Sequence, residues 1–269
     1  MRPGLRLACQ EQLLPGDTLQ QKWETAQQLG FQAIELRGRG NGHFAARLPE
    51  LRRAVADGVP IPTVCVDMTY FVGDFDAERR RDAQAQLRSQ LSTVAAIGGR
   101  LVMTPASYGM FSRRLPPFDP PRSEEEDQAV LVEAFAGLAG HAEAEGVVIG
   151  LEPLNRYEDH MLNRVEQAVE LCNTAGRDSV KVMGDLFHMN IEEDDLAKSI
   201  RAADGYLAHV HLADSNRAHP GTGHTDFAAA FGALRDIGFD GYMAMECAVR
   251  GDAEKVLPQV TRYLRSLAR

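Results

Sequence analysis

The sequence predicts an α/β protein that closes as a single (β/α)8 barrel. Along its 269 residues, short apolar runs alternate eight times with longer amphipathic segments. Strands that alternate with helices need crossover connections, and such connections produce a parallel sheet. Eight strand–helix units in a chain of this length close most simply into a barrel, which typically needs about 250 residues.

Each unit is predicted from an apolar run followed by an amphipathic run. The expected strands are Leu5–Cys9, Ala33–Leu36, Ile61–Val66, Leu101–Thr104, Val147–Glu152, Val180–Asp185, Leu207–Ala213 and Tyr242–Cys247. The expected helices are Thr18–Leu29, Phe44–Asp57, Ala77–Ile97, Glu124–Glu145, Arg164–Ala175, Glu192–Ala203, Phe227–Ile237 and Ala253–Ala268. Most of these helices are followed by a glycine, the residue that best accepts the left-handed backbone of a helix C-cap.

An open, doubly wound sheet is the alternative architecture. It would favour a glycine-rich phosphate loop after the first strand. Here Cys9 is followed by Gln10-Glu11-Gln12, without glycine. The glycine-rich run from Gly38 to Gly42 lacks the dinucleotide-binding spacing, and we interpret it as a flexible loop.

The chain is predicted to form one domain, residues 1–269, with one long loop at residues 105–123 after the fourth strand. Tyr108, Phe111 and five prolines lie in this loop. Connections of this length are usually functional lids or disordered segments, and barrel enzymes place their active sites on this face. We therefore expect a lid or pocket wall. Three arginines in the loop could bind a phosphate or be solvated: Arg113, Arg114 and Arg122.

Composition narrows the function classes. The formal net charge of −9 disfavours a nucleic-acid surface, which needs a basic stripe. No run approaches the 18 apolar residues of a membrane span, and the N-terminus lacks the features of a signal peptide. The four scattered cysteines form neither a disulfide framework nor a metal knuckle. We expect a cytoplasmic protein with no nucleic-acid or membrane partner, and composition leaves a homo-oligomer open.

Each of the last four predicted strands has an acidic residue or a histidine at or near its C-terminal end. Glu152, Asp185, His211 and Glu246 stand at or near these ends, spaced by about one strand–helix unit each. In a barrel these ends converge on one mouth. A single glutamate or histidine at such a place is commonly a solvated or structural residue. Four in register on consecutive strands indicate a site.

Three crowded carboxylates repel one another, and a divalent cation would relieve that repulsion. Oxygen-rich ligands with one nitrogen suit Mn²⁺, Mg²⁺ or Co²⁺, and also admit Zn²⁺. We therefore predict that Glu152, Asp185, His211 and Glu246 bind one divalent cation, with Mn²⁺ favoured.

Several motifs resemble a known family. They are Leu151-Glu152-Pro153-Leu154-Asn155-Arg156-Tyr157-Glu158, the run Gly184–Glu193, His211-Leu212-Ala213-Asp214-Ser215-Asn216-Arg217 and the run Pro220–Phe227. Together they resemble the xylose-isomerase-like TIM-barrel superfamily. Their motifs are most similar to those of ketose 3-epimerases, namely D-tagatose and D-psicose 3-epimerases. The resemblance is strong from about Gly150 to Cys247 and weak in the first half.

The resemblance implies a role for each matching residue. The four strand-end residues match the family's metal ligands, and Glu152 and Glu246 also match its acid/base pair. Glu158, His188 and Arg217 match residues that hold oxygens of the substrate. The implied activity is C3 epimerisation of a small ketose through a metal-stabilised enediolate, in which one carboxylate removes the C3 proton and the other returns it from the opposite face.

Other activities use the same cation and carboxylates. They include aldose–ketose, hydroxypyruvate-type and inosose isomerases or dehydratases on a keto-sugar or polyol, and a lyase subunit that processes keto-glycosides. The net charge of −9 disfavours an apurinic endonuclease, which must bind DNA. A binding protein without turnover is disfavoured because all four ligand positions are filled. Gln10, Glu11 and Gln12 stand where the epimerases carry aromatic residues, so the exact sugar stays open. We expect His209 to face the helices and to be structural.

Overall fold

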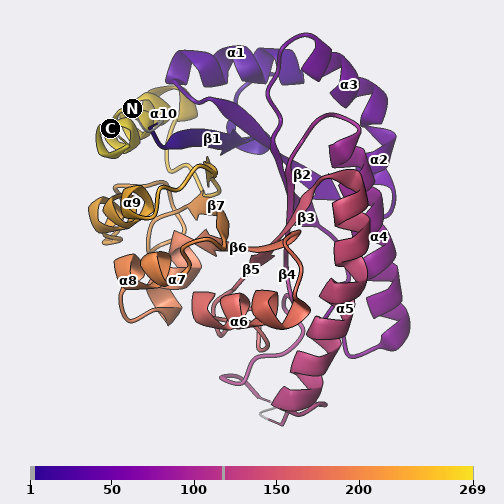
Figure 1. Ribbon diagram of the computed structural model, residues 1–269. Helices are drawn as coiled ribbons and strands as arrows, with labels where there is room; N and C mark the ends of the chain where they lie inside the picture. Colours follow the sequence, from indigo (N-terminus) through magenta and orange to yellow (C-terminus); the bar gives the residue numbers. More distant parts are fainter. Residues whose placement is uncertain (1–3, 117–118, 269) are drawn as a thin grey trace.

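Eight parallel strands form a closed barrel in the computed structural model, which describes residues 4–116 and 119–268. Each strand pairs with the next along the chain, and β8 pairs with β1 (Figure 1). The strands are β1 (Arg6–Gln10), β2 (Ala33–Arg39), β3 (Thr63–Asp67), β4 (Leu101–Pro105), β5 (Val148–Glu152), β6 (Val180–Asp185), β7 (Leu207–Leu212) and β8 (Tyr242–Met245). The predicted (β/α)8 barrel is confirmed.

Helices surround the barrel on its outer side (Figure 1). They are α1 (Leu19–Leu29), α2 (His43–Ala46), α3 (Leu48–Ala56), α4 (Ala77–Ala95), α5 (Glu124–Glu145), α6 (Val165–Ala175), α7 (Leu186–Glu192), α8 (Leu196–Ala202), α9 (Phe227–Asp236) and α10 (Ala253–Leu267), and a short 3₁₀ helix, η1 (Glu11–Leu13), follows β1. No helix among the described residues is long and apolar enough to cross a membrane.

Local chemistry fixes the helix ends. Thr18 and Ser123 begin α1 and α5 with capping boxes, in which side chain and backbone satisfy each other's free groups. Gly30 and Gly146 end the same helices in the left-handed conformation that the sequence predicted.

The structure differs from the expected elements in three places. The helix expected at Phe44–Asp57 is two helices, α2 and α3, and Pro49 stands in the first turn of the second. An additional helix, α7, follows β6 directly, because the Asp185 carboxylate caps it by accepting from the Phe187 N–H at 2.7 Å. Gly38, expected in a flexible loop, belongs to β2.

The barrel interior holds both apolar and polar side chains, and polar groups predominate at its C-terminal mouth. A small cluster of buried side chains fills the centre: Cys65, Leu101, Met103 and Met183. The larger apolar core lies between the strands and the surrounding helices. Alternate residues of each strand point inward, so the inward positions nearest the C-terminal ends carry the polar groups of the site.

Candidate active site

Four side chains from neighbouring strands meet at the C-terminal mouth of the barrel. Glu152 ends β5, Asp185 ends β6, His211 lies in β7 and Glu246 directly follows β8. Each offers one ligand atom, and these atoms all lie within 4.8 Å of one another. The register explains their meeting, because Asp185 pairs with His211 and His211 pairs with Ala244. The structure therefore brings together the four residues that the sequence singled out.

The cluster concentrates negative charge in a largely buried space. Of the four side chains, that of Glu246 is the most exposed, at 22%. Burial opposes the ionisation of Glu246, but the His211 imidazole and the Arg217 guanidinium outweigh it and lower its pKa to about 2. Burial also disfavours a charged His211, yet the carboxylates of Glu35 and Glu246 raise its pKa well above the ordinary value. The cluster thus attracts positive charge.

The donor set fits a divalent cation. Nδ1 of His211 lies 3.2 Å from Oε2 of Glu246 and 3.7 Å from Oε1 of Glu152. Among the described residues it forms no hydrogen bond of good geometry, although it is buried. A buried polar atom without a partner is costly, and so are crowded carboxylates. A cation held by these oxygens and this nitrogen would remove both costs.

Arg217 approaches the cluster from the loop after β7. Its Nη1 lies 2.7 Å from Oδ2 of Asp185, and its Nη2 lies 2.8 Å from Oε2 of Glu246. Its φ of +58° is a left-handed conformation that is uncommon outside glycine. This backbone closes a turn in which the Arg217 N–H donates to the Asp214 carbonyl at 2.8 Å. Strain of this kind clusters at functional sites.

His188 in α7 directs a protonated nitrogen toward the site. Its Nδ1 lies 3.1 Å from the backbone N–H of Asn155, a fixed donor, so Nδ1 accepts and Nε2 carries the proton of the neutral ring. Nε2 lies 3.1 Å from Nη1 of Arg217 and 4.0 Å from Oε2 of Glu158. A ligand oxygen that approaches both nitrogens from the cavity could accept a hydrogen bond from each. Glu158 can accept a hydrogen bond from a hydroxyl beside them.

A cavity of about 500 Å³ lies over these residues. Its volume suits a small organic ligand. Part of its lining, near β1, β2 and β3, is polar: Gln10, Gln12, Arg37 and Asp67. Two aromatic residues that follow β3 and β4, Phe71 and Tyr108, also line it. The predicted substrate residues Glu158, His188 and Arg217 also line this cavity.

The loop at residues 105–123 forms part of the cavity wall. The Tyr108 side chain lines the cavity, although the residue is 56% exposed. The Gly109 N–H donates to the Glu158 carbonyl at 2.8 Å, which ties the loop to the segment that carries a predicted substrate residue. The structure thus supports the pocket-wall interpretation of the loop.

Arg122 at the end of this loop is structural. Its Nε lies 2.8 Å from Oδ1 of buried Asp127, and its guanidinium lies 4.9 Å from the ring centroid of Phe75. It also donates to the backbone carbonyls of Gly73 and Asp74. These contacts engage its guanidinium, so Arg122 is not a freely solvated side chain.

Three buried polar residues contribute to the site without having been predicted there: Gln10, Glu35 and His209. The expectation that His209 faces the helices is wrong. Side chains alternate along a strand, so residues two apart share a face, and both His209 and His211 contact Glu35 inside the barrel. Two signals were available in the sequence. Glu35 interrupts an apolar strand, and the two histidines have the two-residue spacing of one strand face.

The cysteines near the cluster, Cys65 and Cys247, are not among its candidate ligand residues. Burial raises the pKa of Cys247 to about 12, and burial likewise raises the pKa of Cys65 well above its ordinary value. Both thiols are therefore protonated at neutral pH. Their role beside Glu246 is to fill the wall of the cavity.

Comparisons with known proteins show which family this chain resembles. The family model "Xylose isomerase-like TIM barrel" matches residues 23–267. A 3-dehydro-D-guloside 4-epimerase from Escherichia coli (strain K12) is 34% identical over 249 residues, which cover 92% of this chain and 94% of the relative. A D-psicose 3-epimerase from Agrobacterium fabrum is 34% identical over 235 residues, covering 84% of this chain and 78% of the relative.

Solved structures show the same architecture. The crystal structure of the 3-keto-D-glucoside 4-epimerase from E. coli, in its apo form, matches with a TM-score of 0.92 and 33% identity. The match covers 97% of this chain and 99% of that chain. Since the family model spans nearly the whole barrel and these relatives align over most of their length, the chain belongs to the xylose isomerase-like TIM barrel family.

Proposed function

We propose that this protein is a divalent-metal-dependent epimerase that inverts the carbon next to the carbonyl of a keto-sugar. The observation that carries the proposal is the convergence of Glu152, Asp185, His211 and Glu246 within 4.8 Å beneath the cavity. These four residues would hold the cation, for which Mn²⁺ is our first candidate because the ligands are mostly oxygen with one nitrogen. When bound, the cation would supply Lewis acidity that withdraws electron density from the carbonyl oxygen.

Glu152 and Glu246 are the acid/base pair in this proposal. They come from β5 and β8, which are separated by two strands around the barrel mouth. A sugar between them would present opposite faces of one carbon to the two carboxylates. One carboxylate takes the proton from that carbon, and the C–H electron pair moves toward the carbonyl. The other carboxyl group then delivers a proton to the opposite face, so the net change is inversion.

Arg217, His188 and Glu158 position the substrate. Nη1 of Arg217 and Nε2 of His188 lie 3.1 Å apart at the edge of the cavity. Donors placed there would stabilise negative charge that develops on an oxygen of the substrate. Glu158, which is partly exposed at the cavity, accepts a hydrogen bond from a sugar hydroxyl. Donors fixed in advance cost little reorganisation during the reaction.

Two substrate classes fit this reaction, and each is favoured by an observation. A 3-keto-glycoside, inverted at C4, is favoured by the polar part of the cavity lining, formed by Gln10, Gln12, Arg37 and Asp67. It is also favoured by the 3-dehydro-D-guloside 4-epimerase, 94% of whose length aligns with this chain. A free ketose, inverted at C3, is favoured by the D-psicose 3-epimerase relative.

The test is a substrate panel in the presence of Mn²⁺, Mg²⁺ or Co²⁺. A methyl 3-keto-glucoside and several free ketohexoses would be incubated with the protein, and products would be separated by chromatography. We expect a new epimer from one class, and none after EDTA treatment. Absence of any epimer across the panel with all three cations would contradict the proposal, and equal turnover with EDTA would contradict the metal requirement.

A further inference from the structure

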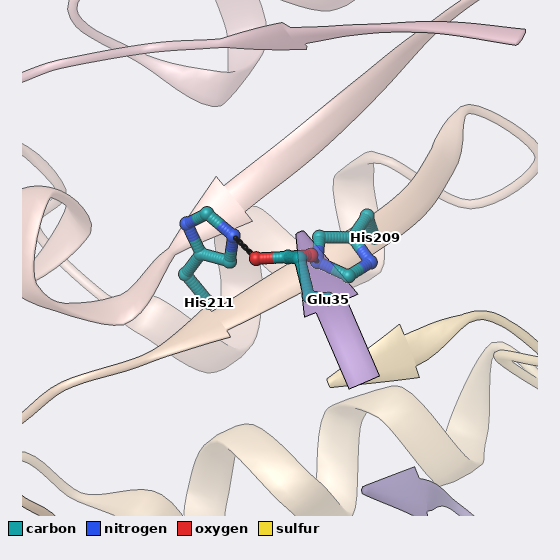
Figure 2. A group of neighbouring side chains, drawn as sticks. All are labelled: Glu35, His209 and His211. Atoms are coloured by element: carbon teal, nitrogen blue, oxygen red, sulfur yellow. Dashed lines mark hydrogen bonds and ion pairs between the residues drawn. The ribbon is translucent and has the colours of Figure 1, made fainter. Parts of the chain in front are cut away.

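A buried carboxylate lies directly beneath the proposed cation site. Glu35, on β2, is fully buried inside the barrel. Its Oε1 lies 2.8 Å from Nε2 of His211 and accepts from Nε2 of Gln10 at 3.0 Å. Its Oε2 lies 2.8 Å from Nε2 of His209 and accepts from the Thr63 hydroxyl at 2.8 Å. Figure 2 shows the carboxylate between the two imidazole rings.

These contacts determine which nitrogen of His211 is free. A carboxylate that accepts a hydrogen bond from Nε2–H keeps the proton on that nitrogen. The lone pair of the neutral ring is then on Nδ1. Nδ1 is the atom that faces Glu246 at 3.2 Å and Glu152 at 3.7 Å. Histidines that bind metals generally donate their other N–H to such a carboxylate, which fixes both tautomer and ring orientation.

The same carboxylate also reaches a second ligand. Gln10 donates to Glu35 and to Oε1 of Glu246, at 3.0 Å and 3.1 Å. The register places Gln10, Glu35 and Thr63 side by side on adjacent strands. One buried residue thereby orients two of the four ligands, His211 directly and Glu246 through Gln10.

We propose that Glu35 is a positioning residue for the cation site, held in place by His209, Gln10 and Thr63. This inference rests on the metal site of the proposed function. Glu35 would set the Nε2–H tautomer of His211 and the orientation of its ring, without binding the cation itself. His209, on the same strand face as His211, places its Nε2 2.8 Å from the other carboxylate oxygen, so the carboxylate lies between the two rings.

A second cation held by Glu35, His209 and His211 is the competing interpretation, since their candidate ligand atoms also lie close together. The geometry argues against it. Both carboxylate oxygens already lie at hydrogen-bond distance from a ring nitrogen, and each accepts from a further donor. All three side chains are fully buried. We therefore expect one bound cation for each chain.

The test measures Mn²⁺ binding to the metal-free protein by the loss of the free-ion EPR signal, a readout independent of turnover. Glu35→Gln keeps the shape of the side chain but replaces one carboxylate oxygen, a hydrogen-bond acceptor, by an NH2 group, a hydrogen-bond donor. We expect its Mn²⁺ dissociation constant to rise about 10- to 100-fold. Glu133→Gln, which makes the same change at an exposed position of α5, is the control, and its dissociation constant should stay at the wild-type value.

The outcomes separate this inference from the proposed function. Wild-type Mn²⁺ affinity in a folded Glu35→Gln variant would overturn the positioning role alone. Two Mn²⁺ ions in the wild type and one in the variant would also overturn it, by making Glu35 a ligand. A wild type that binds no Mn²⁺ would overturn the metal site together with this role.

A second measurement keeps the inference testable if Glu35→Gln does not fold. Long-range ¹H–¹⁵N NMR of the wild-type protein loaded with a diamagnetic cation such as Mg²⁺ reports the protonation of each imidazole nitrogen. We expect a proton on Nε2 of His211 and none on Nδ1. The opposite tautomer would overturn the proposal.

Discussion

The Arg217 guanidinium lies 2.8 Å from the Glu246 carboxylate and shares its charge between that group and Asp185, at 2.7 Å. It is therefore a fixed cation beside two residues that we assign as metal ligands. Its positive charge opposes a bound cation but favours negative charge that develops on a substrate. Arg217 should matter more to turnover than to metal binding.

Replacing Arg217 with methionine tests this division. We expect kcat/KM to fall by about 10²- to 10³-fold, as for the loss of a donor to a developing oxyanion, while Mn²⁺ affinity is unchanged or higher. Arg201→Met, which removes an exposed arginine paired with Asp236, is the control and should keep wild-type kinetics. Weaker Mn²⁺ binding in Arg217→Met would contradict the assigned role.

His188 is expected to act through its Nε2–H. His188→Asn cannot place a donor at the same point, so the variant should lose one hydrogen bond to the substrate. The loss of such a bond, typically about 0.5–1.5 kcal/mol, corresponds to a fall in kcat/KM of roughly two- to thirteenfold. Steady-state kinetics would measure it, with the exposed His43→Asn as the control. An unchanged kcat/KM in His188→Asn would refute the contact.

Asp214 should stabilise the loop after β7 in a pH-dependent way. Burial opposes its ionisation, but backbone N–H groups, among them those of Gly221, Ser215 and Thr225, outweigh it and lower its pKa. A carboxyl group with a depressed folded-state pKa adds stability above its unfolded pKa of about 3.9, and that stability is lost as the pH falls through the folded value.

We therefore compare Asp214→Asn with the wild type by urea unfolding in EDTA. At pH 7 the variant should be less stable by about 1–3 kcal/mol, the typical cost of leaving buried donors without an acceptor. The difference should shrink as the pH falls below about 4. The exposed Asp240→Asn serves as the control and should track the wild type at both pH values. A constant difference for Asp214→Asn down to pH 2 would rule out this account.

The barrel and the four-residue cluster could be predicted from the sequence because both depend on periodic patterns. Strand–helix alternation fixes the topology, and Glu152, Asp185, His211 and Glu246 repeat with it. The role of Glu35 could not be predicted in this way. It depends on which side chains of β2 and β7 meet inside the barrel, across β1 and β8, and the two sequence signals named above do not specify that contact. The structure supplies this distance of 2.8 Å to His211.

The buried ion pair of Arg122 with Asp127 could not be predicted from the sequence for a similar reason. It leads to a prediction about stability. The Arg122 side chain is 14% exposed and pairs with Asp127, which is 4% exposed. Arg122→Met leaves a buried carboxylate without its cation, which typically costs about 3–5 kcal/mol. Arg113→Met, in the same loop, breaks an exposed pair with Glu124 and should cost at most about 1 kcal/mol. Equal urea midpoints for the two variants would contradict the structural role of Arg122.

In the proposed reaction, a carbon next to a carbonyl loses its proton and regains one from the opposite face. Its most direct test is ¹H NMR of the epimer formed in D₂O by the Mn²⁺-loaded protein, after the paramagnetic ion has been removed. The account predicts one deuterium at the inverted carbon, and no incorporation with metal-free protein. An epimer that retains its original hydrogen at that carbon would contradict the account.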